Sequence, residues 1–266
     1  MRIVRWADAD GRVFTGDLRP DGTAELLDGN LPNLTRTGQT AEVGRLLAPI
    51  VPADILCIGL NYQAHADEQG TPPPKNPMLF IKSGNSLAGP HEPVPLPPNS
   101  DKVDYEAELA VVIGTDAKRV PRERALAHVF GYTIANDVSA RDWQKDKDLN
   151  GGQFARGKSF DKFCPLGPAV VTADEVPDPN GLRIACRLNG ETVQDSTTAD
   201  MIFDVAAIIA SLSETMTVRA GSVILTGTPA GVGMARKPPV FLKPGDVTEV
   251  EIERLGTLTT RFVAEE

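Results

Sequence analysis

Hydrophobic and polar positions alternate in short runs along most of this chain, a pattern typical of β-strands. Near the N-terminus three such runs, separated by the turn signals DADG and PDG, are MRIVRWA, RVFTGDL and TAELL. A continuous apolar run, ILCIGL, follows Pro52-Ala53-Asp54 and predicts a buried strand. We therefore expect a small β-rich domain over residues 1–50 and a larger domain over residues 51–266, which begins near this buried strand.

The larger domain mixes many strands with few helices. Its strand-like runs are MLFIK, EAELAVVIG, GYTIAND, SVILTGT, VTEVEIERL and TLTTRFV, and the last two predict a hairpin about Gly256. PRERALAHVF has helical character, and apolar residues from Met201 to Leu212 recur at helical spacing, with Thr198 or Asp200 as the N-cap. Strands outnumber helices and no regular βαβ alternation appears. This pattern predicts an α+β fold that is predominantly β.

Composition and charge limit the classes of function. The chain has 27 Lys and Arg against 36 Asp and Glu, a net charge of −9, so we expect no attraction to nucleic acid or to an anionic membrane. A small anionic substrate would then need a locally bound cation.

The three cysteines are too few and too scattered for a disulfide framework or a zinc cluster. The start of the chain has no apolar run of signal length, and no segment approaches the length of a membrane helix. We therefore expect a cytoplasmic protein with reduced thiols.

Two glutamates in the strand-like run DYEAELAVVI are the first candidates for chemistry. Glu106 and Glu108 are two residues apart, so on a strand their side chains project from one face. Ala110 and Val112 continue that face in apolar character, and a third acid, Asp137, ends the run GYTIAND. Three carboxylates without a nearby His or Cys favour Mg²⁺, Mn²⁺ or Ca²⁺ over zinc. The spacing alone also permits a solvated sheet face.

The string GQFARGKS at residues 152–159 matches the G-x-x-x-x-G-K-S pattern of a nucleotide-binding loop. That loop requires a strand before it and a helix after it. The preceding RDWQKDKDLNG is no buried strand, and Pro165 and Gly167 follow too soon for a useful helix. We therefore expect no nucleotide binding. Lys158, if it lies near the carboxylates, would instead hold a substrate carboxylate or a developing enolate oxygen, and the alternative is a solvated lysine.

A base that works at neutral pH has few candidates, because the chain contains only three histidines. His65 lies in GLNYQAHADEQG, a Gly-bounded segment with helical character. If it is helical, His65 and Glu68 share a face at i, i+3, and the carboxylate orients the imidazole. A solvated pair on an exposed turn is the alternative. His91 in a proline-flanked loop and His128 in PRERALAHVF favour structural roles.

Seven segments, taken in order, resemble the catalytic domain of the fumarylacetoacetate hydrolase family: IGLNYQAHADEQG, FIKSGNSLAGP, DYEAELAVVIG, GYTIANDVSARDWQ, GKSFDKFCPLGP, NGETVQDSTTADMIFD and ILTGTPAGVG. The resemblance runs from about Ile55 to Phe262. It implies a mixed β-sandwich roll with a small N-terminal β-rich domain, and a homodimer. It also implies a role for each candidate residue: Glu106, Glu108 and Asp137 as metal ligands, Lys158 near the metal, Arg141, Gln144 and Thr228 at the substrate, and His65 with Glu68 activating water.

The resemblance leaves the reaction open, and the first hypothesis is a divalent-metal-dependent hydrolase that cleaves a C–C bond in an acylpyruvate-type 2-oxo acid, such as fumarylpyruvate or acetylpyruvate, and releases pyruvate. Related members decarboxylate oxo acids, isomerise or hydrate dienoic acids, or cleave ureidoglycolate, and these activities stay open on the same metal site. A non-catalytic metal-binding or scaffold protein is a third hypothesis. The joint presence of His65, Glu68 and Lys158 argues against it.

Overall fold

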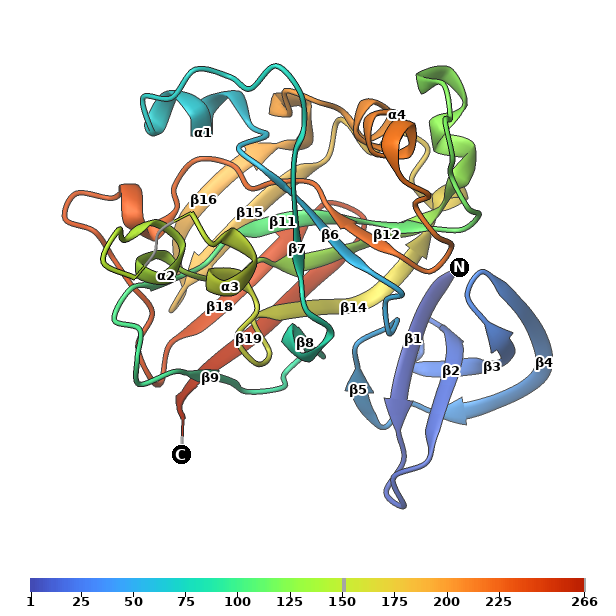
Figure 1. Cartoon of the computed structure of the whole chain (residues 1–266). Coiled ribbons are helices and arrows are strands. Elements are labelled where there is room, and N and C mark those ends of the chain that lie inside the picture. Colours follow the sequence, from blue (N-terminus) through green and yellow to red (C-terminus); the bar gives the residue numbers. More distant parts are fainter. Residues whose placement is uncertain (150–151, 266) are drawn as a thin grey trace.

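The computed structural model describes residues 1–149 and 152–265, and its main element is a twelve-stranded sheet (Figure 1). The strand order is β4-β3-β2-β1-β14-β12-β11-β17-β6-β7, with β5 paired to β1 and β8 paired to β14. In chain order its strands are β1 (Arg2–Ala7), β2 (Val13–Leu18), β3 (Thr23–Asn30), β4 (Asn33–Glu42), β5 (Arg45–Leu47), β6 (Ile55–Gly59), β7 (Met78–Lys82), β8 (Leu87–Ala88), β11 (Ala107–Ile113), β12 (Val129–Asn136), β14 (Cys164–Thr172) and β17 (Val223–Leu225).

A second, five-stranded sheet packs against the large one. Its order is β16-β15-β18-β19-β9, with β9 (Val94–Leu96), β15 (Arg183–Leu188), β16 (Glu191–Thr197), β18 (Val247–Ile252) and β19 (Gly256–Ala264). β10 (Val103–Asp104) and β13 (Ser139–Ala140) form a separate pair. The main core joins the two sheets through large side chains such as Val111, Tyr132, Ile184, Val250 and Phe262. Both sheets contain parallel and antiparallel pairs. The predicted fold class, α+β and predominantly β, is confirmed.

The helices are short and lie outside the sheets. They are α1 (Gln63–Glu68), α2 (Arg141–Lys145), α3 (Phe154–Lys158) and α4 (Val205–Thr215), with 3₁₀ turns η1 (Gly84–Ser86), η2 (Arg122–His128), η3 (Ala173–Glu175), η4 (Thr198–Asp200) and η5 (Gly233–Ala235). Figure 1 shows α1, α2 and α3 on one side of the molecule, and α3 packs on both α2 and β7. Among the helices that the structure describes, none has the length and apolar character needed to cross a membrane.

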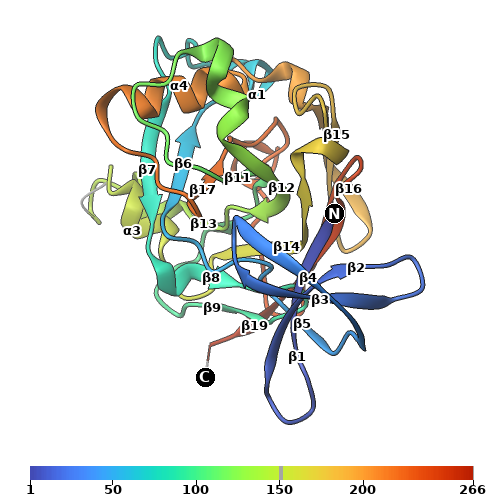
Figure 2. The same cartoon turned by 90° about the vertical axis from the view of Figure 1, so that its right-hand side faces the viewer.

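The five N-terminal strands gather at one end of the molecule, as Figure 2 shows. β1 pairs with β14, where Arg2 lies opposite Val171 and Ile3 opposite Val170. The N-terminal strands therefore continue the large sheet and have their own cluster around Trp6. The domain boundary near residue 50 stays a prediction.

Two local expectations were wrong in detail. The predicted helix from Met201 begins at Val205, because Asp204 is the N-cap and its Oδ1 accepts a hydrogen bond of 2.8 Å from the Ala207 amide. Neither Thr198 nor Asp200 caps this helix. Glu106 lies just before β11 rather than within it, whereas the helical character of PRERALAHVF takes the 3₁₀ form η2.

Candidate metal centre and catalytic pocket

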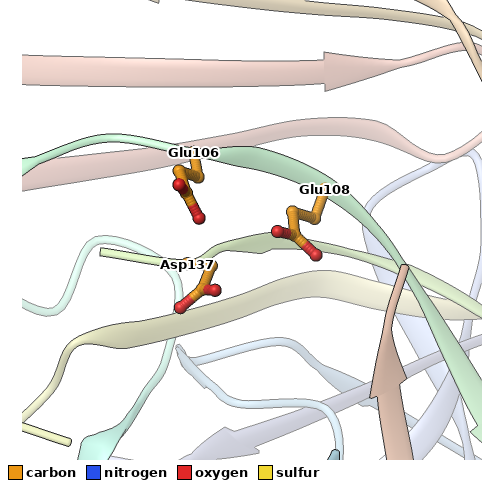
Figure 3. Close-up of side chains that lie close together, drawn as sticks. All are labelled: Glu106, Glu108 and Asp137. Carbon is orange, nitrogen blue, oxygen red and sulfur yellow. The ribbon is translucent and has the colours of Figure 1, made fainter. Parts of the chain in front are cut away.

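Three buried carboxylates lie together in the large sheet. Glu108 comes from β11, Glu106 directly precedes that strand, and Asp137 directly follows β12. β11 and β12 pair with Ala107 opposite Asn136, and the Asp137 amide donates to the Glu106 carbonyl oxygen at 2.8 Å. This register brings the third acid beside the other two. One ligand oxygen from each side chain lies within 4.8 Å of the others, and Figure 3 shows the three side chains close together.

The electrostatics of this cluster favour a bound cation. Burial, together with Asp137 and Glu106, raises the pKa of Glu108 well above its usual value. Burial also raises the pKa of Glu106, but Arg141 and Lys158 outweigh that effect and hold the pKa well below its usual range. Glu108 is therefore the carboxylate whose charge is least compensated in the absence of a cation. An all-oxygen donor set of this kind suits Mg²⁺, Mn²⁺ or Ca²⁺, so the residues present fit a divalent cation.

Lys158 projects from the end of α3 into the cluster. Its Nζ lies 2.6 Å from Glu106 Oε2 and 2.6 Å from Asp137 Oδ2. Burial lowers the pKa of Lys158, but Asp137 and Glu106 outweigh it and raise the pKa above its usual value. The GQFARGKS string therefore contains a buried lysine paired with carboxylates. The helix lies within the string, and the next element is the strand β14, so the arrangement differs from a nucleotide-binding loop.

A second buried lysine was not among the site residues predicted from the sequence. Lys82 ends β7, and its Nζ lies 2.5 Å from Asp137 Oδ1 and donates to the Val138 carbonyl oxygen at 3.1 Å. The sequence contained a signal for this residue, because MLFIK is an apolar strand-like run that ends in a lysine. Asp137 is thus held by two ammonium groups, from Lys82 and Lys158.

Arg141 and Gln144 lie one turn apart on α2 and face the same pocket. Arg141 Nε donates to Asp104 Oδ2 at 2.9 Å, its Nη1 donates to Gln144 Oε1 at 3.1 Å, and its Nη2 lies 2.7 Å from Glu106 Oε1. Asp104, which the sequence analysis missed, also accepts bonds from the backbone amides of Gly233 and Met234. This buried aspartate therefore fixes the guanidinium to the loop that follows β17.

Thr228 lies on that same loop and also lines the pocket. Its hydroxyl accepts a hydrogen bond of 2.9 Å from Gln194 Nε2. Gln194 in turn accepts from the Ala107 amide, so the loop is tied to the start of β11.

His65 and Glu68 form the predicted contact on α1. His65 Nδ1 lies 3.0 Å from Glu68 Oε2, and the other oxygen of Glu68 accepts from the Gly231 amide at 2.9 Å. His65 Nε2 lies 2.6 Å from Gln69 Nε2. Because an amide nitrogen only donates, Nε2 is the acceptor and Nδ1 carries the proton given to Glu68. His91 lies in a loop, and His128 contacts Thr115 at the surface.

One cavity of about 210 Å³ joins these groups. The carboxylates and Lys158 line it together with His65, and its apolar wall includes Ile58, Phe80 and Phe154. Every site residue predicted from the sequence except Glu68 lines this cavity, and Glu68 reaches it through His65. Drug-sized ligands occupy pockets of roughly 300–1,000 Å³, so the cavity favours a small acid. The individual roles of these residues stay predictions.

Comparison with known proteins is consistent with this geometry. Residues 54–263 match the family model described as fumarylacetoacetate (FAA) hydrolase C-terminal. A mitochondrial oxaloacetate tautomerase, fahd2, from Xenopus laevis is 51% identical over 89% of this chain and 72% of its own length. A 5-carboxymethyl-2-hydroxymuconate delta-isomerase structure from Mycobacterium smegmatis has a TM-score of 0.86 and 37% identity, and a fumarylacetoacetate hydrolase from Exiguobacterium antarcticum has a TM-score of 0.84 and 39% identity. Each structural alignment covers 100% of both chains.

Proposed function

Because this chain belongs to the fumarylacetoacetate hydrolase family, we propose that it is a divalent-cation-dependent enzyme that interconverts the enol and keto forms of a small 2-oxo dicarboxylic acid, with oxaloacetate as the first substrate to test. The observation that carries the proposal is one small cavity lined by both a carboxylate cluster and a His–Glu pair. Tautomerisation requires charge stabilisation at the 2-oxo oxygen and a group that moves a proton at C3. The cavity offers a group for each task.

The carboxylate end of the cavity would hold the 2-oxo end of the substrate. A divalent cation held by Glu106, Glu108 and Asp137 would polarise the 2-oxo carbonyl and make the C3 protons more acidic. Lys158 adds a buried ammonium beside the same space, which stabilises negative charge on the enolate oxygen. Arg141 and Gln144 orient the C1 carboxylate from α2.

His65 would move the proton. In the direction from keto to enol, the C3 proton passes to the Nε2 lone pair and the electrons of the C3–H bond form the C2–C3 double bond. The 2-oxo oxygen takes up a proton from solvent. Glu68 holds the Nδ1 proton and stabilises the imidazolium that forms. Gln69 contacts Nε2 and has to move aside before the substrate reaches it.

Hydrolysis of an acylpyruvate is the second candidate, and the likeness to the fumarylacetoacetate hydrolase from Exiguobacterium antarcticum favours it. In that reaction His65 would take its proton from water, and the attack on the distal carbonyl would release pyruvate. Both reactions would use the same binding of the 2-oxo end at the carboxylate cluster. The two reactions differ in their products, because tautomerisation keeps every C–C bond.

Product analysis of the purified protein tests the proposal. The substrates are enol-oxaloacetate, acetylpyruvate and fumarylpyruvate, each with Mg²⁺ and with Mn²⁺. We expect the enol absorbance of oxaloacetate to decay faster with protein than without it, with no matching release of pyruvate. Stoichiometric pyruvate from an acylpyruvate, without acceleration of the enol decay, would identify a hydrolase instead.

A further inference from the structure

A lysine that reaches solvent lines the same cavity as the carboxylate cluster. Lys145 is the last residue of α2, one turn beyond Arg141, and lines the cavity. Arg141 and Lys158 are buried, whereas the side chain of Lys145 reaches solvent. Lys145 therefore adds a solvent-accessible positive charge to the cavity wall.

Lys145 differs from these two cations because no carboxylate of the described residues lies within ion-pair distance of its ammonium group. Arg141 is paired with Asp104 and Glu106, and Lys158 with Glu106 and Asp137. Within residues 1–149 and 152–265, Lys145 makes no ion pair, and its Nζ donates only to the neutral amide oxygen of Gln69 at 3.3 Å. Partial burial and the nearby Arg141 lower the pKa of Lys145, so its charged form gains from any anion placed there. This ammonium is available for a ligand.

We propose that Lys145 selects the substrate by binding the distal carboxylate of a dicarboxylic 2-oxo acid whose 2-oxo end lies at Glu106, Glu108 and Asp137. The inference rests on the proposed function and adds a recognition group for the second carboxylate. The new ion pair would replace a 3.3 Å bond to a neutral amide oxygen by a bond to an oppositely charged carboxylate. A 2-oxo acid with a methyl group in that position would leave Lys145 unpaired.

Gln69 connects this recognition to the base. Its Oε1 accepts from Lys145, and its Nε2 donates to His65 Nε2 at 2.6 Å, so the amide bridges the two. When a substrate carboxylate takes Lys145, Gln69 loses one of its two side-chain partners and is freer to leave Nε2. A dicarboxylic acid would thus bind more tightly and also uncover the base. The discrimination should appear in both KM and kcat.

Binding to two matched probes tests the proposal. Isothermal calorimetry with Mg²⁺ compares 2-oxoglutarate with 2-oxopentanoate, which have the same chain length and differ in the second carboxylate. The variant is Lys145→Met, and the control is Lys147→Met, the same charge change at an exposed position outside the cavity. We expect the wild-type protein and the control to prefer 2-oxoglutarate by about 10-fold or more, the scale of a hydrogen bond to a charged group. Lys145→Met should bind the two probes equally, and Lys145→Arg should restore part of the preference.

Two results would overturn the assignment: equal binding of both probes by the wild-type protein, or an unchanged preference in Lys145→Met. Unchanged Mn²⁺ affinity and thermal midpoint in Lys145→Met establish that the variant is folded. The two proposals fail separately. A Lys145-dependent preference without accelerated enol decay would reject the tautomerase activity and keep Lys145 as the recognition group. Accelerated enol decay without that preference would keep the tautomerase activity and reject the role of Lys145.

Discussion

Lys82 supplies one of the buried positive charges that the carboxylate cluster requires. Its side chain and that of Asp137 are both 0% exposed, and the two are 2.5 Å apart. Breaking a buried pair by removing one partner typically costs about 3–5 kcal/mol, because the other charge stays buried and uncompensated. We therefore expect Lys82→Met to lower the thermal midpoint strongly, whereas Lys75→Met, at an exposed position, should leave it nearly unchanged.

Addition of Mn²⁺ should recover part of the loss in Lys82→Met. The cation would compensate Asp137 and bind only the folded state, so it stabilises by mass action. Thermal midpoints of both variants, with and without Mn²⁺, provide the measurement. Equal midpoints for Lys82→Met and Lys75→Met would show that this ion pair contributes little.

Glu108 should release a proton when a divalent cation binds. Burial, Asp137 and Glu106 raise its pKa in the folded, cation-free protein, so the carboxyl stays protonated at pH values where a free glutamate is ionised. A cation requires the ionised form, so its affinity should increase with pH until the raised pKa is passed. Glu108→Gln should abolish the release, and Glu123→Gln, at an exposed position, should preserve it.

Titration calorimetry with Mn²⁺ in two buffers of different ionisation enthalpy measures that proton. A binding heat that is the same in both buffers for the wild-type protein would contradict the expectation.

Local periodicity predicts site residues whose partners are close along the chain, whereas Lys158, 52 residues from Glu106, was a candidate through its motif and the resemblance. Glu106 and Glu108 share one run, and His65 with Glu68 follows helical spacing, so local periodicity was sufficient. Lys82 and Lys145 were missed because their partners lie 55 and 76 residues away, and only the folded sheet brings them together.

At the level of elements, strands were easier to predict than helix ends. β6, β7 and the β18–β19 hairpin follow apolar runs between clear turn signals. The start of α4 depends on which acidic side chain faces the first turn, and periodicity does not reveal that. Asp204 caps α4, while Asp200 accepts a hydrogen bond of 3.0 Å from the Ala64 amide in the first turn of α1.

These two aspartates should therefore differ in what they control. Asp204→Ala should lower the free energy of unfolding by about 1 kcal/mol, the usual value of an N-cap. Asp200→Ala removes a hydrogen bond to the first turn of α1, which carries His65 and Glu68. We therefore expect turnover to fall about fivefold, the rate change that corresponds to about 1 kcal/mol, and the free energy of unfolding to change less. Urea denaturation and steady-state kinetics of both variants check this. Loss of stability without loss of turnover in Asp200→Ala would place its role outside α1.

At the level of the whole molecule, the predominantly β class was predictable and the strand order was not. β1 pairs with β14, and β17 lies between β6 and β11. Such neighbours are distant in the sequence, and alternation of apolar residues carries no information on which strands pair.

The edge strand β7 exposes the side chains of Leu79 and Ile81, at 41% and 54%.

The homodimer implied by the resemblance stays a prediction, and these exposed side chains offer a surface that it would cover. We expect Ile81→Lys to shift the protein from dimer to monomer in analytical ultracentrifugation. Val13→Lys, which changes a similarly exposed residue (53%) on β2, should leave the dimer intact. A wild-type protein that sediments as a monomer would refute the dimer.

The central claim is that His65 moves a proton at C3 of a 2-oxo dicarboxylic acid held at the carboxylate cluster. The most direct measurement is the rate of enol-oxaloacetate decay with saturating Mg²⁺, in the wild-type protein and in His65→Ala. Pyruvate is followed in the same samples. We predict that the substitution slows protein-dependent decay by about 10²-fold or more, the scale of a lost general base, while Mn²⁺ affinity is unchanged. Decay that survives in His65→Ala within a few-fold would contradict this mechanism.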